Sequence, residues 1–207
     1  MSVKKNSMEG NWTSSNIRTD DDNVEYTIES AKDGYMIYAE DSRDGEELEI
    51  SDIKWDGQVL SFKSFMPSTQ RIAFNRFRLK QNGRVEAKFT FTEYEELKKT
   101  PDVKIESKHS DVMEGRWVGV QPFDENEITQ DFIIKKLGNK FSVKSEFALK
   151  GHKLEVSDVK WNGETLSFMT LARSTGRSCF NQLKINSIGN MDFTYTFSVV
   201  EDLKRIS

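Results

Sequence analysis

An internal duplication constrains this chain more than any other feature of its 207 residues. The segment LEISDIKWDGQVLSF, residues 48–62, returns as LEVSDVKWNGETLSF, residues 154–168. The offset between the copies is 161 − 55 = 106 at Trp55 and Trp161, and it stays 106 to the end of the chain. Each copy therefore keeps every element of the other, as in a tandem duplication of a complete fold.

The copies open at Met8, in MEGNW, and at Met113, in MEGRW, where the offset is 113 − 8 = 105. One inserted residue thus accounts for the whole difference in register. We expect two domains, at residues 8–100 and 113–207, each long enough for a core of its own. The stretch from Thr100 to Val112 is expected to be a short tether between them.

The duplicated segment has the pattern of an antiparallel hairpin. Asp56-Gly57 and Asn162-Gly163 each separate two runs of strand-forming residues, which predicts a two-residue type I′ turn. The apolar alternation before each turn slips by one residue, at Ser51-Asp52 and at Ser157-Asp158. A β-bulge at each place would keep the apolar side chains on one face. Asp52 and Asp158 are then interpreted as bonding freed backbone N–H groups, with a ligand or catalytic carboxylate as the alternative.

Seven strands are expected between Gly10 and Thr92 in the first copy, each joined to the next by turn residues. The last of them alternates apolar and polar residues, which predicts one core face and one solvent face. Thr92-x-x-Glu95 and Ser198-x-x-Glu201 then have the form of a capping box. A short helix should therefore close each copy, with Leu97 and Leu203 as inward anchors.

The fold class expected from these elements is all-β, with two tandem antiparallel meander barrels of about seven to eight strands each. A two-layer sandwich in each copy is the alternative. Gly10-Asn11-Trp12 and Gly115-Arg116-Trp117 resemble the Gly-x-Trp that opens the first strand of lipocalin-like (calycin) barrels. The resemblance implies a barrel that binds a small ligand, with the tryptophan at its closed end. The copies are shorter than typical lipocalins.

Composition excludes several classes of function. The net charge is −4, and neither copy carries the basic excess typical of nucleic-acid or anionic-membrane binding. The sequence has neither an apolar run that could span a bilayer nor a signal-peptide pattern, so a cytoplasmic location is expected. Cys179 is the single cysteine, and the two histidines occupy unrelated places in the copies. We therefore expect no metal site, no cofactor and no catalytic residues, and an enzyme is disfavoured.

The candidate binding residues all recur in both copies. They are the pairs Trp12 and Trp117, Trp55 and Trp161, Arg71 and Arg177, and Asn75 and Asn181. The tryptophans are equally interpretable as core residues. The arginines could bind a carboxylate at a barrel mouth, or pair with the carboxylates at 49 and 52 and at 155 and 158. A second slip of the apolar pattern around Asn75 predicts another bulge, which the asparagine side chain would tie down.

Two functions follow as hypotheses. In the first, the protein is not an enzyme and holds a small apolar or carboxylated ligand in its barrels. In the second, side chains fill the barrels, and the protein is an interaction or assembly module that binds a partner protein or forms a homo-oligomer.

Overall fold

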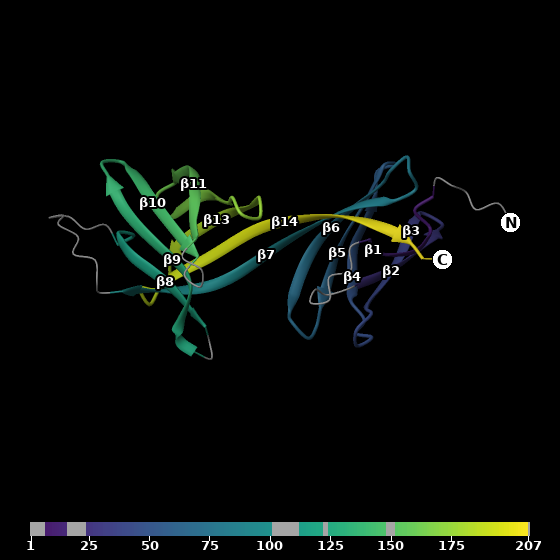
Figure 1. Ribbon diagram of the computed structural model, residues 1–207, viewed down its shortest axis with the longest axis horizontal. Helices are drawn as coiled ribbons and strands as arrows, with labels where there is room; N and C mark the ends of the chain where they lie inside the picture. The colour runs from purple at the N-terminus through teal and green to yellow at the C-terminus, as the bar shows by residue number, and fades with distance from the viewer. Residues whose placement is uncertain (1–6, 16–23, 101–111, 122–123, 148–151, 207) are drawn as a thin grey trace. The chain divides into compact units, whose positions relative to one another are not determined.

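The structure is a computed structural model that describes residues 7–15, 24–100, 112–121, 124–147 and 152–206 (Figure 1). All of its regular elements are strands. The first seven are β1 (Gly10–Ser14), β2 (Val24–Ala31), β3 (Gly34–Asp41), β4 (Glu49–Trp55), β5 (Val59–Met66), β6 (Arg71–Leu79) and β7 (Val85–Thr100). The next seven are β8 (Gly115–Gln121), β9 (Asp124–Leu137), β10 (Lys140–Phe147), β11 (His152–Trp161), β12 (Thr165–Ala172), β13 (Arg177–Ile185) and β14 (Met191–Arg205). The described residues contain no helix that could cross a membrane.

The fourteen strands form one antiparallel sheet, in the order β3-β2-β1-β14-β13-β12-β11-β10-β9-β8-β7-β6-β5-β4, and β14 also pairs with β7. The all-β expectation is therefore confirmed. Strands β3 and β4, at the two ends of this order, also meet. The bridge between Glu40 and Glu47 joins them, and the Leu48 N–H donates to the Ala39 carbonyl at 2.9 Å. The strands thus form a partial ring.

The chain groups into two units that do not follow the two sequence repeats. Unit 1 comprises residues 1–91 and 198–207, and unit 2 comprises residues 92–197. The first half of β7 pairs with β6 in unit 1, and its second half pairs with β8 in unit 2. In the same way, β14 pairs with β13 in unit 2 and ends beside β1 in unit 1. Each repeat therefore contributes its last nine or ten residues, 92–100 or 198–207, to the unit built mainly from the other repeat.

The expected closing helices are wrong, because both segments continue as strands. Residues 92–100 belong to β7 and residues 198–205 belong to β14 (Figure 1, teal and yellow). Leu97 is buried between exposed neighbours, which is the alternation of a strand. Pairing with another strand, distant in sequence, satisfies the backbone groups that a short helix would have satisfied internally. Local helix propensity is weak enough for such tertiary pairing to override it.

The expected bulges before the hairpin turns are confirmed. The register between β4 and β5 shifts between Ser51 and Lys54, and the equivalent shift in repeat 2 lies between Ser157 and Lys160. Asp52 and Asp158 are the extra residues, with φ angles of 54° and 53°. Asparagine and aspartate tolerate this left-handed conformation better than most residues, which explains the aspartate at both positions.

The turns themselves are not type I′. Gly57 has a φ of 93° and Gly163 a φ of 99°, but Asp56 and Asn162 do not have positive φ angles. Each glycine is therefore the first central residue of its turn, as type II′ turns require. The Asp56 carboxylate accepts hydrogen bonds from the two following turn N–H groups at 2.9 and 2.7 Å, and the Asn162 side-chain oxygen does so at 3.0 and 2.7 Å.

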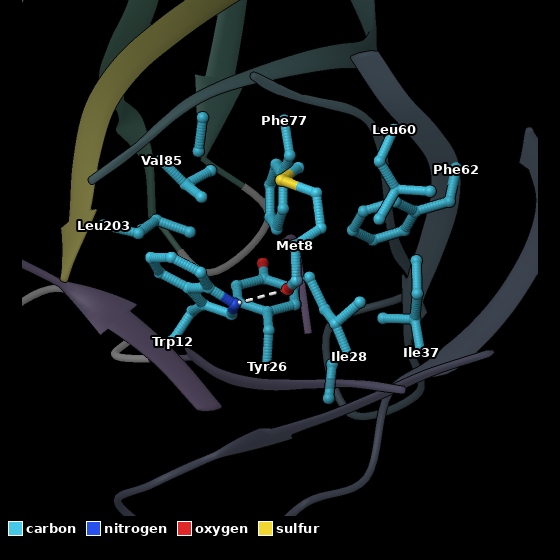
Figure 2. Packing of buried hydrophobic residues seen from close by; sticks show 12 residues of the cluster. Met8, Trp12, Tyr26, Ile28, Ile37, Leu60, Phe62, Phe77, Val85 and Leu203 are labelled. Carbon is cyan, nitrogen blue, oxygen red and sulfur yellow. Dashed lines mark hydrogen bonds between the residues drawn. The ribbon is translucent and has the colours of Figure 1, made fainter. Parts of the chain in front are cut away.

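Each unit has its own apolar core, and both cores are rich in aromatic rings. In unit 1, the Phe77 ring packs edge-on against Tyr26 and Phe62, with centroids 5.0 and 5.1 Å apart (Figure 2). It also packs edge-on against Phe89 at 5.9 Å. In unit 2, Phe132 packs edge-on against Phe168 and Phe193 at 5.7 and 5.1 Å. Edge-to-face packing of this kind favours a densely filled interior.

Candidate functional site

Two of the four candidate tryptophans are core residues. Trp12 and Trp117 are 0% and 1% exposed. The Trp12 Nε1–H donates to the Met8 carbonyl at 2.8 Å (Figure 2), and the Trp117 Nε1–H donates to the Met113 carbonyl at 3.0 Å. Because each indole is buried and its single donor is used, these residues have a structural role in the described protein.

The other two tryptophans lie nearer the surface. Trp55 is 38% exposed, and its ring meets the edge of Tyr35 at a centroid distance of 5.3 Å. Trp161 is half-buried and makes the equivalent contact with Phe141, also at 5.3 Å. The aromatic pair occurs in both units. In unit 1 it leaves part of the Trp55 indole exposed, where a binding partner could contact it.

Asn75 lies in the core of unit 1, and the bulge expected around it is wrong. Strand β6 pairs with β5 and with β7 without a break in register, so Ala73, Asn75 and Phe77 all point inward. The pattern seemed to slip because the inward residue is polar and the outward Phe74 is apolar. The Asn75 Nδ2 donates to the Ser64 Oγ at 2.9 Å and to backbone carbonyls at 3.3 and 3.4 Å.

Asn181 repeats this arrangement in unit 2. Its Nδ2 donates to the Thr170 Oγ1 and to the Cys179 carbonyl, both at 3.0 Å, and to the Phe168 carbonyl at 3.3 Å. Within the described residues, the Asn75 Oδ1 is buried and accepts no hydrogen bond, which is a costly state for a buried polar atom.

Arg71 and Arg177 lie over aromatic rings. The guanidinium carbon of Arg71 is 5.7 Å from the centroid of Phe91, and that of Arg177 is 5.1 Å from the centroid of Phe197. Such stacking holds a guanidinium by cation–π attraction. Both side chains start from exposed positions at the beginning of β6 and β13.

Two of the four carboxylates proposed as partners of these arginines, Asp52 and Glu155, pair with other cations. Asp52 pairs with Lys63 at 2.7 Å, which lowers the pKa of this exposed carboxyl. Glu155 pairs with Arg173. The expectation that Asp52 bonds freed backbone N–H groups is wrong, because its carboxylate is bonded by the Lys63 ammonium instead.

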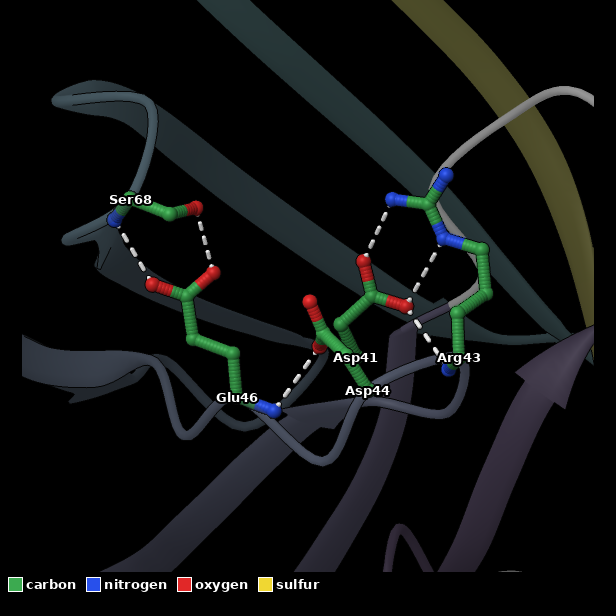
Figure 3. A network of polar contacts seen from close by, with 5 residues as sticks. All are labelled: Asp41, Arg43, Asp44, Glu46 and Ser68. Carbon is green, nitrogen blue, oxygen red and sulfur yellow. Dashed lines mark hydrogen bonds and ion pairs between the residues drawn. The ribbon is translucent and has the colours of Figure 1, made fainter.

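A polar network that the sequence did not indicate ties the β3–β4 connection to the β5–β6 turn (Figure 3). Asp41 is buried and accepts hydrogen bonds from the Arg43 Nη2 at 2.8 Å and Nε at 3.2 Å. The hydrogen bond from this guanidinium lowers the pKa of the Asp41 carboxyl. Glu46 accepts from the Ser68 N–H at 2.7 Å and from its hydroxyl at 2.6 Å. The Asp41 carboxylate is bonded by Arg43 and the Glu46 carboxylate by Ser68, so both contacts have a structural role.

An apolar patch lies on the outer face of unit 1. Ile72 is 56% exposed and Phe74 is 42% exposed, and both point outward from β6. The half-buried Phe65 on β5 is the direct cross-strand neighbour of Ile72. We call Phe65, Ile72 and Phe74 the outer apolar patch. Adjacent exposed apolar side chains on one sheet face are typical of a protein interaction site.

A row of cations runs beside this patch. Lys54 on β4 is paired in register with Ser61, Ser61 with Arg76, and Arg76 with Lys88 on β7. We call Lys54, Arg76 and Lys88 the basic row. All three are exposed. Lys54 lies near enough to Asp52, and Arg76 near enough to Asp56, to help lower the pKa values of these carboxyls. The sequence signal for both features is the outward set of β6, in which two apolar residues are followed by two arginines.

Unit 2 keeps only part of this face. With the offset of 106, Phe74 corresponds to Phe180, which is 41% exposed, but Ile72 corresponds to Ser178. The basic row corresponds to Lys160, Gln182 and Thr194, so two of its three charges are absent. The duplication has therefore left one strong and one weak version of the same surface.

The structure describes the single cysteine and its surroundings. Burial raises the pKa of the Cys179 thiol, which disfavours the reactive thiolate even though Arg177 lies nearby. No group of three or more potential metal ligands occurs within the part of the chain that the structure covers. His109 lies outside the described residues.

Comparisons with known proteins leave the chain without an assigned family. No family model, no curated protein and no solved structure matches it.

Proposed function

We propose that the protein is a non-catalytic interaction module whose two units are barrels filled by their own side chains, and that it binds a partner protein through unit 1. The observation that carries this proposal is the outer apolar patch with the basic row beside it. Exposed apolar side chains supply the contact area, and the three cations supply charge complementarity.

Packing inside unit 1 supports a filled barrel. Tyr26, Phe62, Phe77 and Phe89 form a continuous set of ring contacts, and Trp12 occupies the same core cluster. A barrel of about eight strands has an interior that side chains can fill completely. Large aromatic side chains at these positions leave the outer face as the surface that is available for recognition.

The chemistry of the face favours an acidic partner with apolar side chains. A carboxylate-bearing segment would meet the basic row, while its apolar side chains would pack on Phe74 and Ile72. Charged groups at the rim of such an interface mainly accelerate association and make it sensitive to salt. Binding should therefore weaken as ionic strength rises.

The second repeat supplies a matched set of substitutions for the test. Changing Ile72→Ser, Arg76→Gln and Lys88→Thr gives the face of unit 1 the residues that unit 2 carries at these positions. These side chains are exposed, so the variant should keep the fold. Phe180→Ser, on the weaker face, is the control.

The experiment is affinity capture from the source cells, followed by binding measurements with the purified partner. We expect the triple variant to bind at least roughly tenfold more weakly than the original chain, because hot-spot truncations of this kind cost more than about 1.4 kcal/mol. Phe180→Ser should bind as the original chain does. Equal binding by the triple variant would refute the proposal.

A second candidate function is the holding of a small ligand, as the lipocalin resemblance implies. The observation that favours it is the buried Asn75 Oδ1, which lacks a donor within the described residues. A ligand with an N–H or O–H group could supply that donor. Native mass spectrometry of gently purified protein tests this candidate. A retained mass of a few hundred daltons that is lost in Asn75→Leu, which removes the acceptor oxygen, would support it, and a bare chain mass would refute a tightly held ligand.

A further inference from the structure

The end of β14 is built into unit 1 by a specific set of contacts. Leu203 is 1% exposed and belongs to the apolar core of this unit. The guanidinium of Arg205 lies 4.8 Å from the centroid of Trp12 and donates to the Ser7 carbonyl at 2.7 Å. Just past the end of β1, the Ser15 N–H donates to the carbonyl of residue 202 at 2.8 Å. Unit 1 therefore holds this strand by backbone pairing, one apolar anchor and one cation.

Unit 2 holds the end of β7 in the same way. Leu97 is fully buried in the core of unit 2. The ammonium of Lys99 lies 5.2 Å from the centroid of Trp117 and donates to the Val112 carbonyl at 3.4 Å. Lys99 is also the direct strand partner of Trp117, just as Arg205 is the strand partner of Trp12.

Two different segments thus occupy equivalent sites in the two units. We define the cradle of each unit as the edge of one strand together with the buried tryptophan on that strand. In unit 1 this is β1 with Trp12, and in unit 2 it is β8 with Trp117. The segments that occupy the cradles are EELKK, residues 95–99, and EDLKR, residues 201–205. They share a glutamate, a second acidic residue, the buried leucine, a lysine and a basic residue over the indole. Each cradle is thus filled by a segment of this pattern.

We propose that the cradle of unit 1 is a binding site for an extended strand of this pattern, and that a second copy of this chain supplies the strand. This strand reaches unit 1 from residues 92–197, which belong to unit 2, so residues 1–91 of unit 1 supply no strand of their own at this place. An identical strand from another copy makes identical contacts, and exchange therefore loses no contact energy. Exchange of identical elements in this manner is a low-cost route to dimers.

Concentration decides which copy fills the cradle. The chain's own strand is held at a local concentration that is in the millimolar range for a short connection. Mixed species should therefore form when the strand is released and the protein is kept concentrated. Charge supports the docking, because Lys80 of unit 1 pairs with Asp202 of the strand at 2.7 Å.

The experiment mixes two full-length versions of the chain that differ in mass through a tag. The mixture is brought to the midpoint of unfolding at high concentration, returned to native buffer and analysed by native mass spectrometry. We expect mixed dimers that are stable after dilution. Dimers of one version alone, or monomers alone, would overturn the proposal.

Peptide competition tests whether the cradle is the site of exchange. A peptide of residues 197–207 in excess during refolding should lower the yield of mixed dimers by roughly tenfold, and the same peptide with Leu203→Asp should have no effect because a buried charge is costly. A peptide of residues 91–101, from the other repeat, should also compete. Mixed dimers that are insensitive to both native peptides would overturn the proposal.

Discussion

Truncation of Leu203 tests whether the end of β14 lies in unit 1, as in the structure, or with the rest of repeat 2, as the sequence repeats suggest. Leu203 belongs to repeat 2 but lies in the core of unit 1, where it is 1% exposed. Replacing a fully buried leucine with alanine removes its transfer free energy and leaves a cavity. Measured costs of such changes centre on about 3 kcal/mol. Leu203→Ala should therefore destabilise unit 1 by about this amount.

Hydrogen exchange followed by mass spectrometry is the assay, because it reports on each strand separately. A loss of about 3 kcal/mol corresponds to roughly a hundredfold faster exchange through the opened state. For Leu203→Ala, we expect this acceleration in β1, β2, β5 and β6, with a smaller change in β8 to β13. The matched control, Leu97→Ala, should give the reverse distribution. An equal or larger acceleration in β8 to β13 for Leu203→Ala would refute the reasoning.

Three further predictions concern single side chains. Asp158→Val should lower the free energy of unfolding by about 1–2 kcal/mol, because a β-branched residue fits poorly at a φ of 53°, whereas Asp158→Gly should not; urea denaturation measures both, and equal losses would contradict the bulge geometry. The pKa of Asp41 is lowered by Arg43, so the stabilisation that this carboxylate gives the fold is present above the ordinary carboxyl pKa and is lost as pH falls through the folded-state value. Asp41→Asn should lower the free energy of unfolding by about 1–3 kcal/mol at neutral pH and make it depend less on pH in the acid range. Burial, together with Glu201, raises the pKa of Tyr26, so the contribution of this neutral phenol to stability is full below the ordinary tyrosine pKa and falls as pH rises above it. Tyr26→Phe should therefore make the free energy of unfolding fall less steeply at alkaline pH, in denaturation measured up to about pH 11. An unchanged slope would contradict this.

Local patterns in the sequence were sufficient for much of the fold. The parity slip at Ser51-Asp52 predicted the bulge, because the side-chain period of a strand is two and only an extra residue can restore it. The same argument failed at Asn75, where a polar inward residue imitates a slip. An alternation through Ala73, Asn75 and Phe77 was present in the sequence and needed no bulge.

The exchange of strands between the repeats could not be read from the sequence. Leu97 and Leu203 are equivalent, as are Lys99 and Arg205, so each segment would make the same local contacts in either unit. Only the path of the chain distinguishes the two arrangements, and this depends on the continuation of β7 and β14 past residues 91 and 197. The capping-box pattern concealed that continuation, because it favours a helix start where the strand runs on.

The outer apolar patch was also missed, for a different reason. The slip inferred around Asn75 counted Phe74 with the inward apolar residues and gave Ile72 no role, although a two-residue period places both opposite Ala73 and Asn75. Apolar residues on an outer face are indistinguishable from core residues by composition alone. Their exposure becomes evident only when the inward set is known.

Cleavage of the chain between the repeats is the most direct test of the strand exchange. A protease site placed within residues 101–111 of the full chain would be cut after folding, and the product would be analysed by size-exclusion chromatography with light scattering. Because residues 92–100 belong to unit 2 and residues 198–205 to unit 1, we expect both pieces to remain together until the protein is unfolded. Separation of the cut protein into two folded pieces under native conditions would contradict the account.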